Sequence, residues 1–328
     1  MTVTTQIISS GQVRLQAFTR GEASNPAIVL VHGYPNFLPD NHSVWDAVAE
    51  NLAKNFYVIA YDVRGAGQSD KPKKIADYQM PLLAQDLLAV VDTLIPGRSF
   101  HLAAHDWGSI QSWESVTTEA LKGRILSYSS VSGPCLDHMG FWMRNHLFST
   151  SFTKLAKAVR QLFSSWYIVF FQLPILAPLM WRSGLAKVWP AYLRWREGVD
   201  EPDVNPTQGE DGAIGVRLYR ANFISKMFRP QPRFAHCPVQ LIVPTGDNYV
   251  GTQLFSELTN WVEHLYRRDI DATHWVLLTH SKEIAEWIAE FANVIGTDED
   301  DSALHDIRVL PLSANLFSTT QQPKHTGA

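Results

Sequence analysis

A strongly apolar run that stops at a tight turn and continues as a helix constrains this chain more than any other feature. The run covers residues 100–105, the turn reads Ala-His-Asp-Trp-Gly over 104–108, and a helix-like segment follows over 109–120. Small residues flank the turn because a larger side chain on either side would clash with the neighbouring backbone. A strand–turn–helix junction of this kind pushes its central side chain, here Asp106, into a cleft.

This turn usually carries a serine nucleophile, and the aspartate in its place changes the chemistry. A carboxylate is nucleophilic at neutral pH without a base, and it suits attack on a saturated carbon to give an alkyl ester. An aspartate before a helix is also a common N-cap, whose side chain accepts a backbone N–H. The turn alone leaves both interpretations of Asp106 open, and the rest of the chain decides between them.

Other apolar runs alternate with helical patterns on both sides of this turn. We expect strands at 13–19, 26–32, 56–61, 100–105, 125–131, 239–243 and 265–270, and helices at 42–54, 79–94, 109–120, 252–262 and 281–294. Continuous apolar strands that alternate with helices predict an α/β fold with a mostly parallel, doubly wound sheet covered by helices on both faces.

The alternation is interrupted between residues 134 and 235, where aromatic residues, leucine and arginine dominate with helical spacing. A stretch rich in proline, aspartate and glycine at 198–212 splits this segment and predicts a loop. We therefore expect a core built from residues 1–133 and 236–296, with residues 134–235 inserted as a helical lid. Residues 297–328 carry Asp-Glu-Asp-Asp at 298–301 and end in polar residues, which predicts a flexible acidic and polar tail.

The charge is spread unevenly along the chain. The formal net charge of −4 argues against nucleic-acid binding, but residues 134–235 hold 13 Lys and Arg against 7 Asp and Glu. This basic, aromatic-rich segment suits an anionic substrate or a membrane surface, and a merely solvated basic face is the alternative that the sequence favours. Residues 162–180 are the most apolar, but a glutamine and two prolines break them too often for a spanning helix.

The two cysteines, Cys135 and Cys237, predict no disulfide framework and fit a reducing compartment. Residues 1–10 lack a basic region followed by an apolar run, so we expect no signal peptide and a cytoplasmic location. The sequence leaves a monomer and a homodimer open.

Candidate site residues follow three of the predicted strands at their carboxyl ends, where open parallel sheets place their sites. Gly33 follows the strand at 26–32, and the backbone N–H of Tyr34 can pair with that of Trp107 to form an oxyanion hole. An ordinary glycine–proline turn is the alternative there.

Asp247 follows the strand at 239–243, and His274 lies in the loop after the strand at 265–270. An acid in that position can orient a histidine and stabilise its cation. Asp269 and Asp271 are rival acids, but neither follows a core strand as cleanly.

Two tyrosines of the lid, Tyr167 and Tyr219, complete the set of candidates. A neutral phenol has a pKa of about 10 and can protonate a developing alkoxide. Packing within an aromatic lid is the alternative for either tyrosine taken alone.

Taken in order, these motifs resemble those of epoxide hydrolases of the α/β-hydrolase fold. The matching segments are His-Gly-Tyr-Pro at 32–35, Asp-Val-Arg-Gly-Ala-Gly-Gln-Ser at 62–69, His-Asp-Trp-Gly at 105–108, Tyr167, Tyr219, Asp247 and His-Trp at 274–275. The resemblance runs from about residue 10 to 296. The segment 36–44 is longer than is usual in the family, and the tail lies outside the pattern.

This resemblance implies hydrolysis of an epoxide to a vicinal diol through a covalent ester on Asp106. In the first step Tyr167 and Tyr219 hydrogen-bond the ring oxygen and donate a proton. In the second step His274, oriented by Asp247, activates the water that cleaves the ester. Neither a metal nor an organic cofactor is required.

The aromatic lid suggests a lipophilic substrate, with Trp166, Phe171, Trp275 and His105 as expected contacts. A haloalkane or haloacid dehalogenase uses the same aspartate turn, but a departing halide needs no proton from the tyrosine pair. A non-catalytic ligand-binding protein with the α/β-hydrolase fold is the third hypothesis. None of the candidate acids and bases is missing, which disfavours it.

Overall fold

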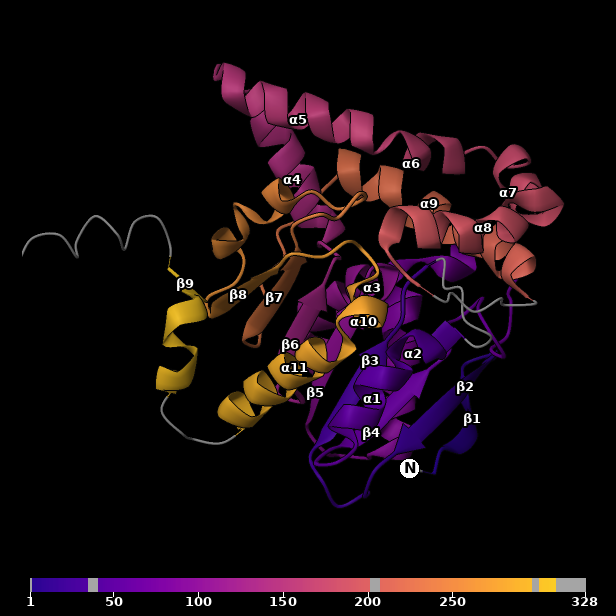
Figure 1. The fold of residues 1–328 in the computed structure, drawn as a ribbon, viewed down its shortest axis with the longest axis vertical. Helices are drawn as coiled ribbons and strands as arrows, with labels where there is room; N and C mark the ends of the chain where they lie inside the picture. The colour runs from indigo at the N-terminus through magenta and orange to yellow at the C-terminus, as the bar shows by residue number, and fades with distance from the viewer. Residues whose placement is uncertain (1, 35–40, 201–206, 297–300, 311–328) are drawn as a thin grey trace, which may run out of the picture.

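The computed structural model describes residues 2–34, 41–200, 207–296 and 301–310, and its strands form one twisted sheet (Figure 1). The strands are β1 (Thr4–Ser10), β2 (Val13–Arg20), β3 (Ala27–Val31), β4 (Tyr57–Tyr61), β5 (Phe100–His105), β6 (Ile125–Val131), β7 (Val239–Pro244), β8 (Leu265–Ile270) and β9 (Arg308–Val309). They lie in the order β1-β2-β4-β3-β5-β6-β7-β8-β9.

The centre of the sheet is parallel and its edges are antiparallel. Pairing is parallel from β4 through β3, β5, β6 and β7 to β8, whereas β1, β2 and β9 run antiparallel to their neighbours. Every residue of β3 and β5 is buried, because helices cover both faces of these strands. The predicted doubly wound, mostly parallel sheet is thus confirmed.

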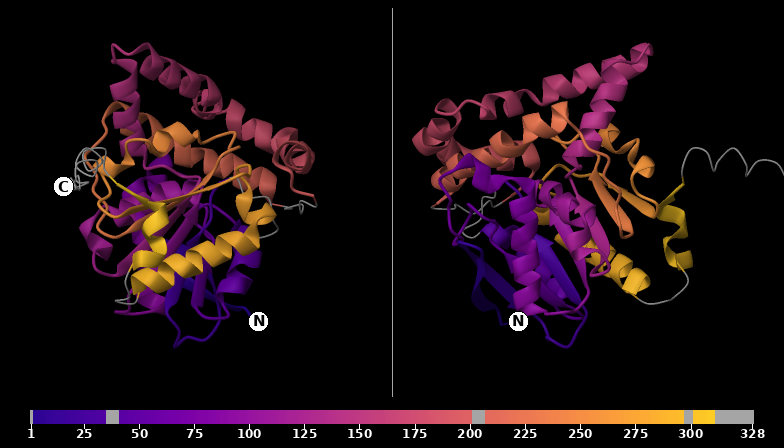
Figure 2. Two further views of the ribbon diagram at one scale, coloured as in Figure 1. Left: turned by 60° about the vertical axis from the view of Figure 1, so that its left-hand side comes forward. Right: turned by 180° about the vertical axis from the view of Figure 1, so that it is seen from behind.

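Helices α1 (Asp46–Leu52) and α11 (Ser281–Gly296) pack together, and α2 (Met80–Leu94) packs with α3 (Trp107–Val116). The two further views in Figure 2 show the helices on either side of the sheet. On α2, the apolar residues Leu83, Leu87, Val90 and Val91 are buried against the core.

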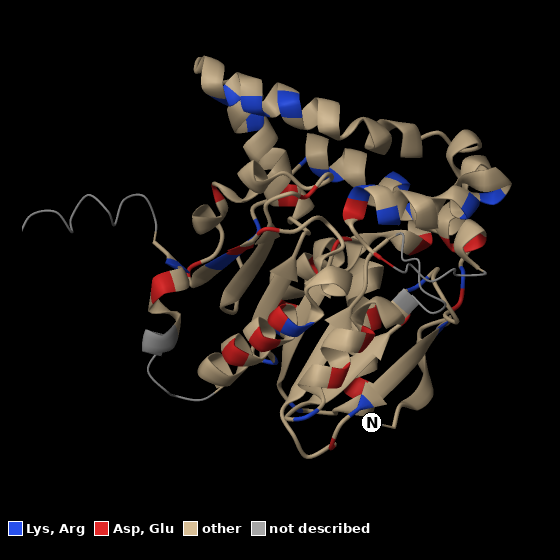
Figure 3. Ribbon diagram, in the orientation of Figure 1, with Lys and Arg blue, Asp and Glu red and all other residues tan. Residues whose placement is uncertain are grey.

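The chain between β6 and β7 is helical and lies above one edge of the sheet (Figure 1). Its helices are α4 (Leu136–Leu147), α5 (Phe152–Ser164), α6 (Trp166–Phe171), α7 (Leu176–Met180), α8 (Ala186–Tyr192) and α9 (Gln208–Phe228), with π-helical turns at Trp181–Leu185 and Leu193–Glu197. We keep the name lid for residues 134–235 as a proposed domain division. Basic side chains are spread over the lid, while acidic ones gather on α11 (Figure 3).

Several element predictions need correction. The strand β1 is not predicted, and the expected helix at 252–262 is two short 3-10 turns, Thr252–Phe255 and Leu258–Asn260. The expected loop at 198–212 is too long, because α9 already begins at Gln208.

The tail prediction is also wrong in part. A 3-10 segment at Asp301–Ile307 buries Leu304 completely, and β9 adds to the edge of the sheet beside β8. Residues 297–300 and 311–328, like 36–40 of the longer entrance segment, lie outside the described residues. Among the helices that are described, none combines the length and apolarity needed to cross a bilayer.

Candidate active site

Asp106 sits at a sharp bend between β5 and α3. Its backbone has φ 52° and ψ −124°, a strained conformation for a residue with a side chain, and such strain gathers at functional sites. Its side chain makes no capping hydrogen bond to α3, so the N-cap interpretation is wrong. The carboxylate instead faces a cavity that it shares with His274.

Glycines make room for this bend. A Cβ atom on Gly108 would lie 2.2 Å from the carbonyl oxygen of Val31, and one on Gly33 would lie 2.6 Å from the Asp106 carboxylate. The close approach of β3, the bend and the start of α3 therefore requires glycine at both positions.

Asp106, His274 and Asp247 form a connected line of side chains. The His274 Nδ1 lies 2.9 Å from Asp247 Oδ2, and its Nε2 lies 3.4 Å from Asp106 Oδ1. Asp106 and His274 are buried, as is the side chain of Asp247, and the three come from the ends of β5, β7 and β8, as the parallel sheet predicts. The rival Asp269 instead pairs with Arg267 of the same strand, and half of its side chain is exposed.

The two carboxylates set the charge of the histidine. Burial lowers the pKa of His274, but the charges and hydrogen-bond acceptors of Asp247 and Asp106 outweigh it and hold that pKa well above 6.5. Burial raises the pKa of Asp247, yet His274 and the amides of Tyr249 and Val250 hold it below its ordinary value. Both carboxylates therefore favour the protonated, cationic form of His274.

The backbone N–H of Tyr34 donates a 2.8 Å hydrogen bond to Asp106 Oδ2. One carboxylate oxygen is thus held by a main-chain donor of the predicted oxyanion hole, and the other faces His274. Trp107 is the first residue of α3, and its ring packs against Tyr219 with centroids 4.7 Å apart.

Tyr167 on α6 and Tyr219 on α9 enter the same cavity from the lid. Their ring centroids are 6.2 Å apart. Burial and the nearby Asp106 charge raise the pKa of both phenols above the ordinary value, so both stay protonated at neutral pH. They are available as proton donors rather than as bases.

The cavity has a volume of about 480 Å³. Its wall is largely aromatic and apolar: Tyr34, Asp106, Ser164, Trp166, Tyr167, Phe170, Phe171, Met180, Trp181, Leu185, Trp189, Tyr192, Arg196, Tyr219, Asn248, Tyr249, His274 and Trp275. Three of the expected substrate contacts, Trp166, Phe171 and Trp275, lie in this wall.

His105 does not, and its prediction as a substrate contact is wrong. It is fully buried, and its Nε2 lies 2.9 Å from the carbonyl oxygen of His274. Burial, followed by the nearby His274 charge, lowers the pKa of His105 to about 4, so it is a neutral support for the histidine loop.

Sequence reasoning missed Tyr249 and Tyr192. The Tyr249 ring lies 4.9 Å from the His274 ring, and its hydroxyl is 2.7 Å from that of Tyr192. The available signal was the position of Tyr249 two residues after Asp247, in a turn whose amides bind that carboxylate. Tyr192 carries no local signal, because only the folded lid brings it there.

Among the residues that the structure describes, no group of three His, Cys, Asp or Glu side chains is placed to hold a metal ion. The expectation that no cofactor is needed stays a prediction.

Comparison with known proteins places the fold. A family model described as the alpha/beta hydrolase fold matches residues 26–281. The chain is 35% identical over 301 residues to a protein of Mycobacterium tuberculosis named probable oxidoreductase EphD, covering 89% of this chain and 50% of that relative. This chain thus spans about half the length of that relative.

Other similar proteins carry a different name. Epoxide hydrolase 3 of Xenopus tropicalis is 24% identical over 305 residues, which cover 85% of this chain and 74% of that protein. The crystal structure of an epoxide hydrolase of Bacillus megaterium with an inhibitor superimposes with a TM-score of 0.70 at 20% identity, covering 88% of this chain and all of that one. At this identity, the structural likeness concerns the fold.

Proposed function

The chain belongs to the α/β-hydrolase fold family, and we propose that it hydrolyses an epoxide to a vicinal diol through an ester on Asp106. The observation that carries this proposal is the pair of neutral phenols, Tyr167 and Tyr219, in one cavity with the carboxylate of Asp106. Opening an epoxide requires a nucleophile on carbon and a proton on oxygen, and this cavity holds both. The names of several relatives agree with it.

In the first step, Oδ1 of Asp106 attacks an oxirane carbon. Oδ2 is held by the Tyr34 amide and becomes the carbonyl oxygen of the ester, whereas Oδ1 faces His274 and the cavity. The carbon–oxygen bond of the ring breaks as a phenol of Tyr167 or Tyr219 gives its proton to the leaving oxygen. The product is a hydroxyalkyl ester, and the proton deficit on the tyrosine is made up from solvent.

In the second step, water attacks the ester carbonyl. Esterification removes the negative charge of Asp106, which is one of the causes that raise the pKa of His274. The imidazole can then lose its proton and act as a general base, while Asp247 stabilises the cation that forms. The tetrahedral oxyanion is held by the amides of Tyr34 and Trp107. The bond between the acyl carbon and Oδ1 then breaks, the leaving oxygen takes up the second proton of the attacking water to give the diol, and Asp106 is left as a carboxylate beside protonated His274.

A dehalogenase is the runner-up and is not favoured. It would leave both phenols without a chemical role, and the Trp107 ring that could bind a halide is not part of the cavity wall. A ligand-binding protein without catalysis would not need the connected Asp106, His274 and Asp247.

The test is a trapping experiment. His274→Gln should accumulate the ester, seen as an increase in protein mass equal to that of styrene oxide and located on the peptide containing Asp106. In heavy-oxygen water, a single turnover of the unchanged enzyme should place the isotope in that peptide. Incubation with 1-bromobutane is the control, and release of bromide without diol from styrene oxide would favour the dehalogenase.

The cavity wall points to a lipophilic epoxide, with water as second substrate. The cytoplasmic location, the choice between monomer and homodimer, and the absence of nucleic-acid binding stay predictions.

A further inference from the structure

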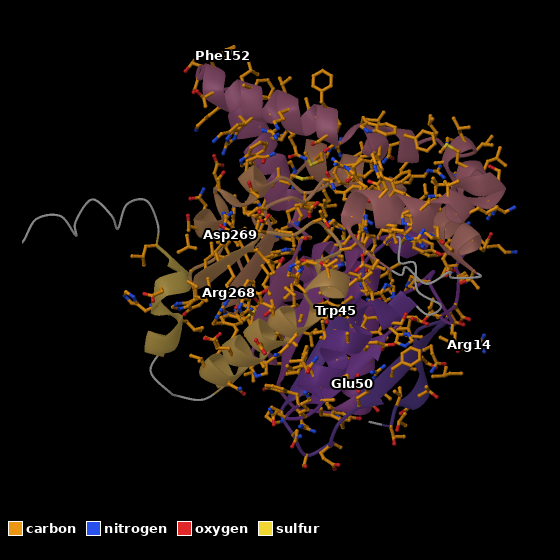
Figure 4. All side chains as sticks on the ribbon, in the orientation of Figure 1. Arg14, Trp45, Glu50, Phe152, Arg268 and Asp269 are labelled. Carbon is orange, nitrogen blue, oxygen red and sulfur yellow. The ribbon has the colours of Figure 1, made fainter. Side chains whose placement is uncertain are left out.

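The outer side of the lid exposes an unusual amount of apolar surface. On α5, the apolar residues at 152, 155, 159, 162 and 163 share one face of the helix by their spacing. In a globular protein such a stripe faces the core, but here the helix buries only Ala158 and Gln161. Phe152 is 84% exposed and stands at the outer end of α5, where Figure 4 labels it.

The apolar surface continues along the next two helices, α6 and α7, which follow α5 across the top of the molecule in Figure 1. Its exposed members on the three helices and their links are Phe152, Leu155, Val159, Leu162, Phe163, Trp166, Val169, Leu173, Ile175, Leu176, Leu179 and Met180. We call this set the outer lid face. Soluble monomers rarely expose so many large apolar side chains together, and such patches mark interaction sites.

The same region carries only positive charge. From His138 to Arg196 the sequence contains no Asp or Glu but eight Lys and Arg. Lys154, Lys157 and Arg160 occupy the other faces of α5, exposed, and no ion pair is found for them among the described residues (Figure 3). The surface is therefore cationic as well as apolar.

We propose that the outer lid face docks on an anionic lipid bilayer. Helices with an exposed apolar face flanked by lysine and arginine lie in the plane of the lipid interface, held by apolar burial and by attraction to anionic headgroups. The 13 residues of α5 are too few to cross the bilayer, so the contact is superficial. A second copy of this chain is the weaker candidate occupant, because it would bring an equally cationic face.

The cavity reaches this face at two residues. Trp166 lines the cavity and is 67% exposed, and Met180 also belongs to both the cavity wall and the outer lid face. Docking would therefore bring this part of the cavity wall against the lipid, where a membrane-dissolved epoxide could enter without crossing water. This part of the inference rests on the proposed function, whereas docking itself does not.

Binding is tested by sedimentation with vesicles of phosphatidylcholine alone, or of three parts phosphatidylcholine to one part phosphatidylglycerol. We expect binding to the anionic vesicles that weakens with salt, and a loss of at least about tenfold in Phe152→Ser with Phe163→Ser. Charge reversal by Lys154→Glu with Lys157→Glu should remove the preference for phosphatidylglycerol. These side chains are exposed, so thermal unfolding should not change.

Matched controls lie far from the lid. Ile7→Ser removes a 61% exposed apolar side chain from β1, and Lys282→Glu reverses an exposed charge on α11. Both should bind like the unchanged protein. If the unchanged protein binds neither kind of vesicle, or if the control variants lose as much binding as the lid variants, the docking proposal is overturned. So would a concentration-dependent dimer that the phenylalanine variant dissolves, because the face would then be an interface between copies.

A second readout separates the two proposals. The variant with Phe152→Ser and Phe163→Ser should hydrolyse styrene oxide in solution at the normal rate but lose at least about tenfold on an epoxy fatty acid ester held in anionic vesicles. An equal rate on the vesicle-borne ester would overturn the access route. If no form of the protein hydrolyses styrene oxide, the proposed function fails, and the sedimentation result still decides docking.

Discussion

Replacing Tyr219 by phenylalanine removes one oxygen atom from the cavity and leaves the ring in place. The ring contacts with Trp107 at 4.7 Å and Phe171 at 4.9 Å do not involve the hydroxyl. The free energy of unfolding should therefore change by no more than one hydrogen bond, about 0.5–1.5 kcal/mol. Any larger loss of activity must then come from chemistry and not from folding.

The expected loss follows from the role of the phenol. A positioned general acid contributes about 10²–10⁴-fold to a rate, or about 2.7–5.5 kcal/mol of activation free energy. Tyr167 remains in the same cavity in the single variant, so ester formation should slow by about 10²-fold. In the double variant, Tyr167→Phe with Tyr219→Phe, the loss should approach about 10⁴-fold.

The assay is single-turnover ester formation with styrene oxide in a His274→Gln background, followed by intact-protein mass. Tyr192→Phe is the matched control, because it removes the same oxygen from the same cavity wall, where its hydroxyl bonds only Tyr249 among the described residues. The control should form ester at close to the unchanged rate. A double variant that forms ester normally, or a control that slows equally, would refute the assignment of the two phenols as the acids.

The bend and the histidine supply the remaining predictions. Gly108→Ala places a carbon 2.2 Å from the backbone oxygen of Val31, so the free energy of unfolding should fall by about 1–3 kcal/mol. Gly184→Ala is the control: a Cβ there meets nothing within 4 Å, so the melting temperature should not change. The turnover number should fall at acidic pH, because His274 of the ester enzyme becomes protonated and can no longer act as a base. The rate of ester formation on Asp106, measured before the steady state, should not show this acidic decrease. The same acidic decrease in both rates would contradict the base role of His274. The raised pKa of His274 stabilises the folded state below about pH 6.5 and this contribution is lost as pH rises through the folded value. Urea unfolding from pH 6 upward should therefore weaken more in the unchanged protein than in His274→Gln, and parallel curves would argue against the shift.

Local sequence patterns predicted the centre of the sheet well. The structure gives β5, β6 and β8 the bounds expected from the sequence. Burial on both faces leaves few alternatives for a strand such as β5, whereas β6 holds three serines and β8 is partly exposed at residues 267–269. The junction at Asp106 was also predictable, because the close approach of the neighbouring backbone at the end of the strand requires small residues there.

Edge elements were not predictable from the same signal. Only two of the seven residues of β1 are buried, and its sequence alternates poorly, so its stability comes from the register with β2. The two residues of β9 form a strand only because β8 offers an open edge. The predicted helix at 252–262 failed because apolar spacing in a short window does not distinguish an α-helix from successive 3-10 turns.

The error over His105 has a simpler cause. Successive side chains of a strand point to opposite faces. His105, the last residue of β5, therefore does not enter the cavity that Asp106 faces. Tyr249 was missed because its place beside His274 depends on a turn organised by the Asp247 carboxylate. Motif spacing brings together the residues of the triad, whereas the cavity wall depends on how the lid folds back over them.

Tyr34 shows how the core chemistry depends on that lid. Its amide holds Oδ2 of Asp106, and its hydroxyl donates to the carbonyl oxygen of Gly212 on α9 at 2.5 Å. A Cβ on Gly215 of the same helix would lie 2.0 Å from the Tyr34 ring, so only a glycine lets α9 pack this closely. The amide that holds the proposed nucleophile is therefore held in turn by the helix that carries Tyr219. Since the proposed nucleophile, oxyanion donor and acid share one chain of contacts, the position of α9 would set the geometry of both proposed steps, and the outer helices α5 to α7 are left free to present their apolar face outward.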